Sequence, residues 1–374
     1  MVPLMSKTLV LAIVFLGALP AFSQELSSPP GVVAGVSSGA LSIRAPEDST
    51  MVLEGSPLSA GVPEVSPALS VGPTSLAESE EPFIPPILPC ACGCGIFEVG
   101  NGAMLPQGQG GLIFFEWDYQ SQNHNWSRHS RAPAEDNSDK LLMTSFLRLG
   151  LQYMFSDQWG VEVDLPFAHR YFRTDDGSGT GTNVSTEWTD WGDMRLKGLY
   201  TGFFKDLSLG VDFGLKVPTG NYTHEIADRD TELGTGSTDL LLGGYYRTAI
   251  SADRQWNAFF QVEGDFPILI RDQYRPGLEV DASAGIDYQG LSLGKATLVP
   301  FGQVLLAGKT SDRGANSAQP VSSGYQRVLL APGLELMMHP FMIYGDVEFP
   351  VWQNYRGDQL VASALFKLVI AISF

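Results

Sequence analysis

The sequence predicts an all-β protein, a transmembrane antiparallel β-barrel of about twelve strands that follows a disordered N-terminal tail. Three observations support this prediction: a two-residue alternation at the C-terminal end, a secretory signal at the N-terminal end, and connections that alternate long and short. After the signal, no apolar run is long enough to cross a bilayer as a helix. A chain that spans lipid without helices must form a closed barrel, because every backbone polar group needs a partner there.

The C-terminal segment, residues 360–374, alternates with a period of two. Counting back from Phe374, every second residue is apolar as far as Leu360, whereas Lys367 belongs to the other face. A lysine on the lipid face would cost roughly 2–4 kcal/mol near the bilayer midplane, so we expect Lys367 to point into a lumen. A long last strand that ends in an aromatic residue resembles the signal read by the barrel-assembly machinery, which makes Phe374 the expected assembly signal. The alternative is an edge strand of a soluble sandwich.

The N-terminal part of the chain divides into three segments before the barrel. Residues 1–23 predict a signal peptide, with Lys7 before an apolar stretch and a small-x-small cleavage site at residues 21–23. Residues 24–89 are rich in proline and serine and predict a disordered periplasmic tail. Residues 90–109 hold all three cysteines and predict a plug or linker, and residues 110–374 predict the barrel.

From residue 110 onward, segments with strand character are separated by turn-rich connections. Long connections at 121–140, 173–190 and 219–237 alternate with short ones. Outer-membrane barrels have short periplasmic turns and longer outer loops, so the chain is expected in the bacterial outer membrane with its N-terminal tail in the periplasm. The predicted strands are 110–120, 141–155, 160–172, 191–203, 207–218, 238–250, 256–268, 277–289, 291–306, 326–338, 341–350 and 360–374.

The same alternation assigns charged residues to the barrel interior. Because acidic residues outnumber basic ones there, the lumen is expected to disfavour anions; the alternative is that opposite charges pair and only serve the structure. A net charge of −18 and the absence of a basic stripe argue against a nucleic-acid partner. The expected lumen-lining residues are Asp164, Arg195, Lys197, Asp212, Lys216, Asp239, Arg247, Glu263, Asp265, Glu279, Asp281, Asp346, Glu348 and Lys367.

Two short turn motifs carry a resemblance to a known family. Residues 216–220 read Lys-Val-Pro-Thr-Gly, and residues 234–239 read Gly-Thr-Gly-Ser-Thr-Asp. Both resemble elements of the outer-membrane channel family named for the meta-pathway of phenol degradation, with Val217 in place of its usual leucine. The resemblance covers residues 105–374 and implies a barrel, similar to fatty-acid channels, that passes small and often hydrophobic or aromatic solutes. The expected function is passive uptake or efflux of such solutes.

The cysteine segment suggests a second function. Cys90, Cys92 and Cys94 alternate with small residues, and three thiols in this spacing are able to bind a soft metal such as Cu(I) or Zn(II). The alternative is one disulfide and a free thiol in an oxidising periplasm. The second functional hypothesis is therefore an outer-membrane barrel that binds a soft metal or a periplasmic partner through this segment, and no other cofactor is expected.

An enzyme is not expected, and no catalytic residue is assigned. A barrel hydrolase needs a nucleophile with a histidine and an orienting partner. The histidines stand outside any recognisable nucleophile motif, so a barrel enzyme that uses loop histidines remains only a third alternative. They are His124, His129, His169, His224 and His339.

Overall fold

The structure is a computed structural model that describes residues 104–374, apart from 225–226, 316 and 318–321. The expected signal peptide and tail lie outside the described residues. So does the part of the plug or linker segment that contains Cys90, Cys92 and Cys94.

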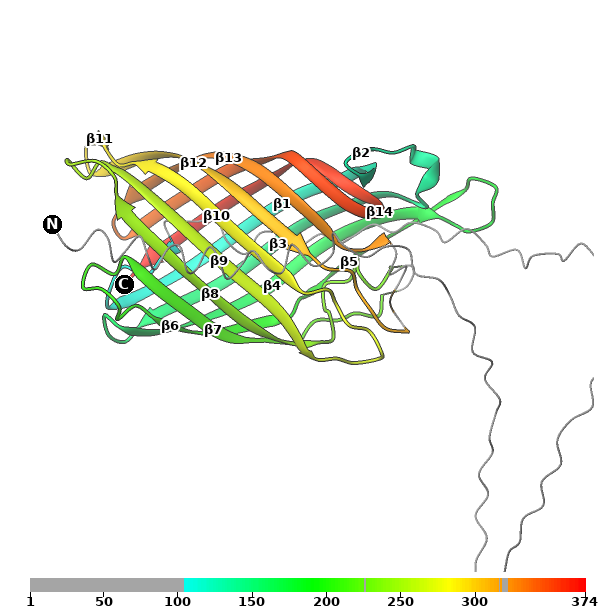
Figure 1. Ribbon diagram of the computed structural model, residues 1–374, viewed down its shortest axis with the longest axis horizontal. Coiled ribbons are helices and arrows are strands. Elements are labelled where there is room, and N and C mark those ends of the chain that lie inside the picture. Colours follow the sequence, from blue (N-terminus) through cyan, green and yellow to red (C-terminus); the bar gives the residue numbers. More distant parts are fainter. Residues whose placement is uncertain (1–103, 225–226, 316, 318–321) are drawn as a thin grey trace, which may run out of the picture. The chain divides into compact units, whose positions relative to one another are not determined.

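Almost every element in the described chain is a β-strand, and Figure 1 shows the strands running obliquely around a ring. One short 3₁₀ helix, η3 (Ala134–Asp136), interrupts them, and no helix among the described residues could cross a membrane. The strands are β1 (Gly110–Arg128), β2 (Ser130–Arg131), β3 (Asp139–Met154), β4 (Trp159–Asp175), β5 (Asn183–Trp191), β6 (Met194–Tyr200), β7 (Leu209–Val217), β8 (Thr238–Ala249), β9 (Trp256–Leu269), β10 (Glu279–Tyr288), β11 (Leu291–Leu293), β12 (Ala296–Lys309), β13 (Tyr325–Met338) and β14 (Phe341–Ser373).

The strands form one antiparallel sheet that closes on itself. Neighbouring strands follow the order β10, β9, β8, β7, β6, β4, β3, β1, β14, β13 and β12, and β12 pairs back with β10. These eleven labelled strands make the ring, whereas β2, β5 and β11 are extra strands that pair with one neighbour each. Closure leaves the ring without a free edge, so its backbone groups are paired within the wall. The predicted all-β antiparallel barrel is confirmed.

The element β14 crosses the wall twice. Residues 341–355 pair with β13, and residues 355–373 pair with β1. The chain reverses near Gly357, whose φ is +74°, and the Ser373 amide donates to the Pro340 carbonyl (2.9 Å), so the two halves lie side by side. The ring is therefore crossed twelve times, once by each of ten strands and twice by β14. The predicted connection 351–359 is wrong because β14 continues to a tight glycine turn.

The expected strand 110–120 is longer in the structure, because β1 continues to Arg128, eight residues into the expected loop 121–140. Two other expected segments contain structure that was not predicted. The expected loop 173–190 contains β5, which pairs with the outer part of β4 to form a protruding hairpin. The expected strand 291–306 is split at Gly294 (φ +69°) into β11 and β12, which form a small hairpin. β5 and β11 each follow or precede a local turn, and each pairs with one strand only, β4 and β12 respectively. The mostly polar sequence of β5 has no apolar stripe that would have indicated it.

The two ends of the barrel have connections of different length. We call one the short-turn end, with connections 155–158, 201–208, 250–255, 289–295 and 339–340. We call the other the long-loop end, with connections 129–138, 176–182, 218–237, 270–278 and 310–324. The barrel begins and finishes at the short-turn end. There the Gly111 amide donates to the Phe374 carbonyl (2.7 Å), and the Phe374 amide donates to the Gly111 carbonyl (2.9 Å).

The wall is apolar outside and largely polar inside, which reverses the pattern of a soluble protein. In the last strand the exposed fraction is 38% for Leu368 but 5% for Lys367, and Phe366, Ile370 and Phe374 are exposed like Leu368. An apolar belt of this extent suits a hydrocarbon solvent. The pattern predicted for this strand fails at Leu360 and Ala362, which are buried. The pairing of this strand with β1 shifts register at Gln120 and Gln122, and these shifts turn Leu360 and Ala362 toward the interior.

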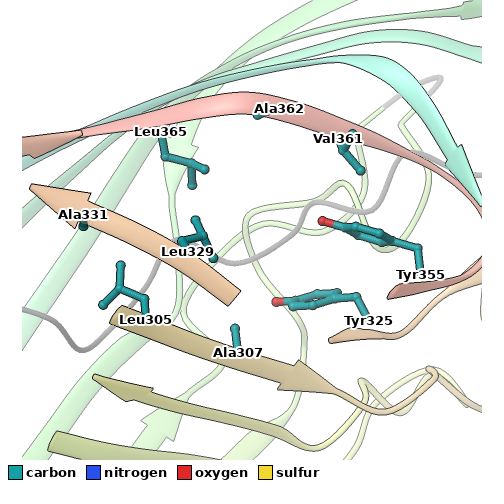
Figure 2. Close-up of a cluster of buried hydrophobic side chains, with 9 residues drawn as sticks. All are labelled: Leu305, Ala307, Tyr325, Leu329, Ala331, Tyr355, Val361, Ala362 and Leu365. Carbon is teal, nitrogen blue, oxygen red and sulfur yellow. The ribbon is translucent and has the colours of Figure 1, made fainter. Parts of the chain in front are cut away.

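One part of the interior is packed with apolar side chains. Figure 2 shows this cluster on neighbouring strands, near the turn within β14. We call it the apolar arc; it comes from β12, β13 and β14, and Trp126 packs against it. Its members are Leu305, Ala307, Tyr325, Leu329, Ala331, Tyr355, Val361, Ala362 and Leu365.

Candidate functional site

Among the cavities lined by the described residues, three follow one another along the barrel. The short-turn cavity measures about 680 Å³, the middle cavity about 80 Å³ and the long-loop cavity about 160 Å³. Leu105 lines both the short-turn and the middle cavity. Arg148 and Glu263 line both the middle and the long-loop cavity. The candidate functional site is therefore a series of chambers with two partitions.

The first partition comes from the chain that precedes β1. Leu105 is buried against Tyr245 of β8 and Phe259 of β9. The Gln152 Nε2 donates to the Met104 carbonyl (3.2 Å), and the Arg247 Nη2 donates to the Pro106 carbonyl (3.0 Å). The described end of the predicted plug or linker segment thus lies inside the lumen.

The second partition is built from charged side chains around Lys197 of β6. The Lys197 Nζ lies 2.7 Å from Glu162 Oε1 and 3.9 Å from Asp164 Oδ2, both on the neighbouring strand β4. It also lies 3.2 Å from Glu263 Oε2 of β9. Because β7 and β8 separate β6 from β9 in the ring, the pair with Glu263 reaches across part of the lumen.

Two further cations form ion pairs with carboxylates of β9. The Arg195 Nη2 of β6 lies 2.6 Å from Glu263 Oε1, and the Lys216 Nζ of β7 lies 2.6 Å from Asp265 Oδ2. Lys216 also pairs with Asp239, its register partner on β8. We call nine inward-facing charged residues of β4 and β6–β9 the ionic arc: Glu162, Asp164, Arg195, Lys197, Asp212, Lys216, Asp239, Glu263 and Asp265.

A third charged group lies where β1, β3 and β14 meet. The Glu116 carboxylate is 2.7 Å from Arg148 Nη2 and 3.7 Å from Lys367 Nζ. Both Glu348 and Asp346 of β14 are buried, and Asp346 accepts hydrogen bonds from Tyr344 and from Gln303 (2.7 and 3.0 Å). Carboxylates thus accompany every cation of this group.

The remaining predicted lumen residues, together with Asp212 of the ionic arc, are described by the cavities that they line. Glu279 accepts a hydrogen bond from the Tyr325 hydroxyl, and both Glu279 and Asp281 line the long-loop cavity. Asp212 lines the middle cavity, and Arg247 lines the short-turn cavity.

Alternation also placed Arg148 inside the barrel, whereas two other buried cations, Arg170 and Arg327, were not predicted to face the lumen. Arg170 was detectable from the sequence, because steps of two from Asp164 along β4 reach it. Arg327 is followed on its own face by Leu329 and Ala331, so no polar alternation indicated it.

The long-loop cavity is covered by part of connection 218–237. From the barrel side, the Arg170 Nη1 donates to the carbonyls of Thr231 and Glu232. Asp193 accepts hydrogen bonds from the Gly220 amide (3.0 Å) and the Thr235 amide (2.7 Å). These contacts hold both arms of the connection against the barrel, and we call its described residues the roof.

Arg229 ties the roof to a second connection. Its guanidinium lies 3.7 Å from the Tyr222 ring centroid and 4.7 Å from that of Tyr274, a geometry that favours cation–π attraction. The Tyr274 hydroxyl donates to Asp312 (2.9 Å), and burial beside this carboxylate raises the pKa of Tyr274 well above its ordinary value. Because Tyr274 and Asp312 belong to connections 270–278 and 310–324, three long connections meet above the cavity.

The cysteines expected to bind metal lie outside the described residues, so the structure does not test that prediction. Among the described residues, no group of three or more potential ligands is arranged to hold a metal ion. His169 contacts the Thr189 hydroxyl (2.8 Å), and His224 contacts the Glu232 carboxylate (2.7 Å).

Comparisons with known proteins locate the fold. Neither the protein-family models nor the curated proteins gave a match. Among solved structures, the chain resembles an outer-membrane channel from Pseudomonas putida F1, with a TM-score of 0.54 and 15% identity over 74% of this chain and 100% of that one. At this identity the likeness shows the fold alone, which is that of an outer-membrane β-barrel.

Two further structures match more weakly, and we build no argument on them. They are the toluene transporter TodX of P. putida (TM-score 0.34, 10% identity, 74% of this chain and 94% of that one) and a Pseudomonas aeruginosa FadL homologue (0.35, 8%, 70% and 90%). The likeness to the P. putida F1 channel does not confirm the resemblance to the meta-pathway family, which stays a prediction.

Proposed function

We propose that this protein is a channel of the bacterial outer membrane through which small solutes diffuse, by uptake or efflux. The observation that carries the proposal is the series of three cavities inside a closed barrel whose outer surface is apolar. The fold shared with the P. putida F1 channel supports it. The short-turn end then faces the periplasm, as in other outer-membrane barrels, and the N-terminal tail is periplasmic.

The narrow lumen favours small solutes that pass one at a time. A ring of this size is too narrow for a wide aqueous pore but leaves room for a path lined by side chains. Leu105, the Lys197 cluster and the roof each narrow that path. Hydrophobic or aromatic solutes, which the motif resemblance implies, are the first class to test.

Residues 90–109 are proposed to act as a plug at the periplasmic mouth. The support is that Met104, Leu105 and Pro106 lie within the lumen. There Gln152 binds the Met104 carbonyl and Arg247 binds the Pro106 carbonyl. Replacing Leu105 with serine removes the apolar contact with Tyr245 and Phe259 that separates two cavities. We expect this variant to conduct more than the parent chain.

Two partners follow from the same proposal. The apolar belt requires outer-membrane lipid, and the paired, lipid-facing C-terminal Phe374 is proposed as the assembly signal for the barrel-assembly machinery. The excess of carboxylates in the lumen is proposed to favour cations over anions.

Planar bilayer recordings of the mature protein test the channel directly. We expect discrete conductance steps and, in a KCl gradient, a reversal potential that indicates preference for K⁺. A preparation that inserts into the bilayer, yet gives no steps in either the parent or the Leu105→Ser variant, would contradict the proposal. Release of phenol from loaded vesicles then tests the aromatic solute class.

The metal hypothesis rests on residues outside the described part of the chain and stays a prediction. Metal analysis of the purified protein would check it, with Cys90, Cys92 and Cys94 together replaced by serine as the control. Equal metal content in the two proteins would remove that function.

A further inference from the structure

Two ion pairs between strands that are not neighbours line the long-loop cavity. Arg195 of β6 pairs with Glu263 of β9 at 2.6 Å, and Lys216 of β7 pairs with Asp265 of β9 at 2.6 Å. All four residues line the cavity, and their side chains are largely withdrawn from solvent. A solute that moves from this cavity toward the middle cavity must pass Glu263, which lines both.

Such a solute has to separate charges that are buried together. Leaving one partner of a buried ion pair without its counter-charge is strongly unfavourable. A solute with one charge compensates only one partner, and a neutral solute compensates neither. A solute with both an anionic and a cationic group can replace each partner, because its carboxylate binds the arginine or lysine while its ammonium binds the glutamate or aspartate.

The remaining lining of the cavity is compatible with such a molecule. Asp265 uses Oδ2 for Lys216, whereas its Oδ1 is buried and accepts no hydrogen bond from the described residues, so this carboxylate holds one oxygen that an ammonium group could satisfy once Lys216 is displaced. Phe146 and Leu233 add apolar surface between the charged walls. The volume of about 160 Å³ is close to that of a cavity that holds benzene, roughly 150 Å³, so a small body between the two charges fits.

We propose that the long-loop cavity is a selectivity site for small zwitterionic solutes, which cross the Arg195–Glu263 and Lys216–Asp265 pairs by exchanging ion-pair partners with them. The inference rests on the proposed channel function and names a solute class for it. An aliphatic or small aromatic body is accepted, provided that it carries one carboxylate and one ammonium group.

Solute passage into proteoliposomes measures this preference without any variant. The probes are 4-aminobutyrate, butyrate and butyramide, which share a carbon chain but carry two charges, one charge and none. We expect 4-aminobutyrate to pass about tenfold faster than butyramide, the ratio that corresponds to about 1.4 kcal/mol, and butyrate to be slowest because of the carboxylate excess.

Variants then assign the preference to the ion pair. The Glu263→Gln variant should lose most of the tenfold preference, whereas Glu263→Asp, which retains a carboxylate between Arg195 and Lys197, should keep most of it. The matched control is Glu187→Gln, which makes the same chemical change at an exposed position of β5 and should keep the full preference. Resistance to protease and heat-dependent gel migration verify that each barrel has formed.

The outcomes separate this inference from the channel function itself. Clear K⁺ conductance together with equal passage of 4-aminobutyrate and butyramide would overturn the zwitterion site and leave the channel intact. Absence of both conductance and solute passage in correctly inserted protein would refute the channel, and the site with it.

Discussion

The ionic arc and the apolar arc occupy the same lumen but differ in what they face. The ionic arc borders the middle and long-loop cavities, and its charges pair across strands that are not neighbours. No member of the apolar arc lines any of the three cavities described above. Its side chains pack against one another, as in the core of a soluble protein.

This difference separates two tasks of the barrel interior. The apolar arc fills space and stabilises the wall near the turn of β14, whereas the ionic arc controls what enters the path. An inward-facing residue is therefore not automatically a residue that a solute meets. Substitutions in the ionic arc should alter stability and selectivity together, and those in the apolar arc should alter stability alone.

The largest effect is expected for Lys197→Met. The substitution leaves Glu162, Asp164 and Glu263 close together without their shared cation. Breaking a buried ion pair by removing one partner costs about 3–5 kcal/mol. Reversible urea unfolding in lipid vesicles measures the free energy of unfolding, and Lys205→Met, at an exposed position in a short turn, is the control. A loss no larger than that of the control would indicate that the three carboxylates are well solvated.

A smaller loss is expected for Leu329→Ala in the apolar arc. Leu329 is 0% exposed, whereas its neighbour Leu330 is 46% exposed on the outer face. Truncating a buried leucine to alanine costs about 2–5 kcal/mol, and we expect about 3 here. The Leu330→Ala variant should lose less, and the ion selectivity of both should equal that of the parent. Altered selectivity in Leu329→Ala would place the apolar arc on the solute path.

The roof over the long-loop cavity should respond to Arg170→Gln. The guanidinium holds the Thr231 and Glu232 carbonyls, and hydrogen bonds from charged donors contribute about 1.5–3 kcal/mol. We expect a loss of about 2 kcal/mol, faster proteolysis within connection 218–237 and higher conductance. The exposed Arg173→Gln on the same strand is the control, and unchanged proteolysis in Arg170→Gln would mean that other contacts suffice.

The smallest effect is expected where the apolar arc meets the charged side of the lumen. The Tyr325 hydroxyl donates to the Glu279 carboxylate, so Tyr325→Phe removes this hydrogen bond while it keeps the packed ring. A loss of about 1.5 kcal/mol, the low end of the range for a hydrogen bond to a charged group, is expected from urea unfolding. The Tyr171→Phe variant, on a half-buried ring of β4, serves as the comparison, and an equal change in both would assign no stability to the contact with Glu279.

Individual residues show how far the sequence could predict this arrangement. Lys367 and Leu368 were assigned to opposite faces from alternation, and the structure buries one and exposes the other. On β13 the same reasoning is weak, because inward Leu329 and outward Leu330 are both apolar. Leu105 carried no signal at all, since its position depends on Tyr245 and Phe259, more than a hundred residues away.

The sequence by itself determined that this protein is an antiparallel barrel with an apolar exterior, because a period of two between two solvents is a local property of each strand. It also determined which charges point inward on β6, β7 and β9. Only the tertiary structure decided that Glu263 binds Arg195 and Lys197. Contacts between strands that are not neighbours depend on the curvature and closure of the whole ring. The position of Leu105 in the lumen and the position of the roof depend on the same curvature and closure.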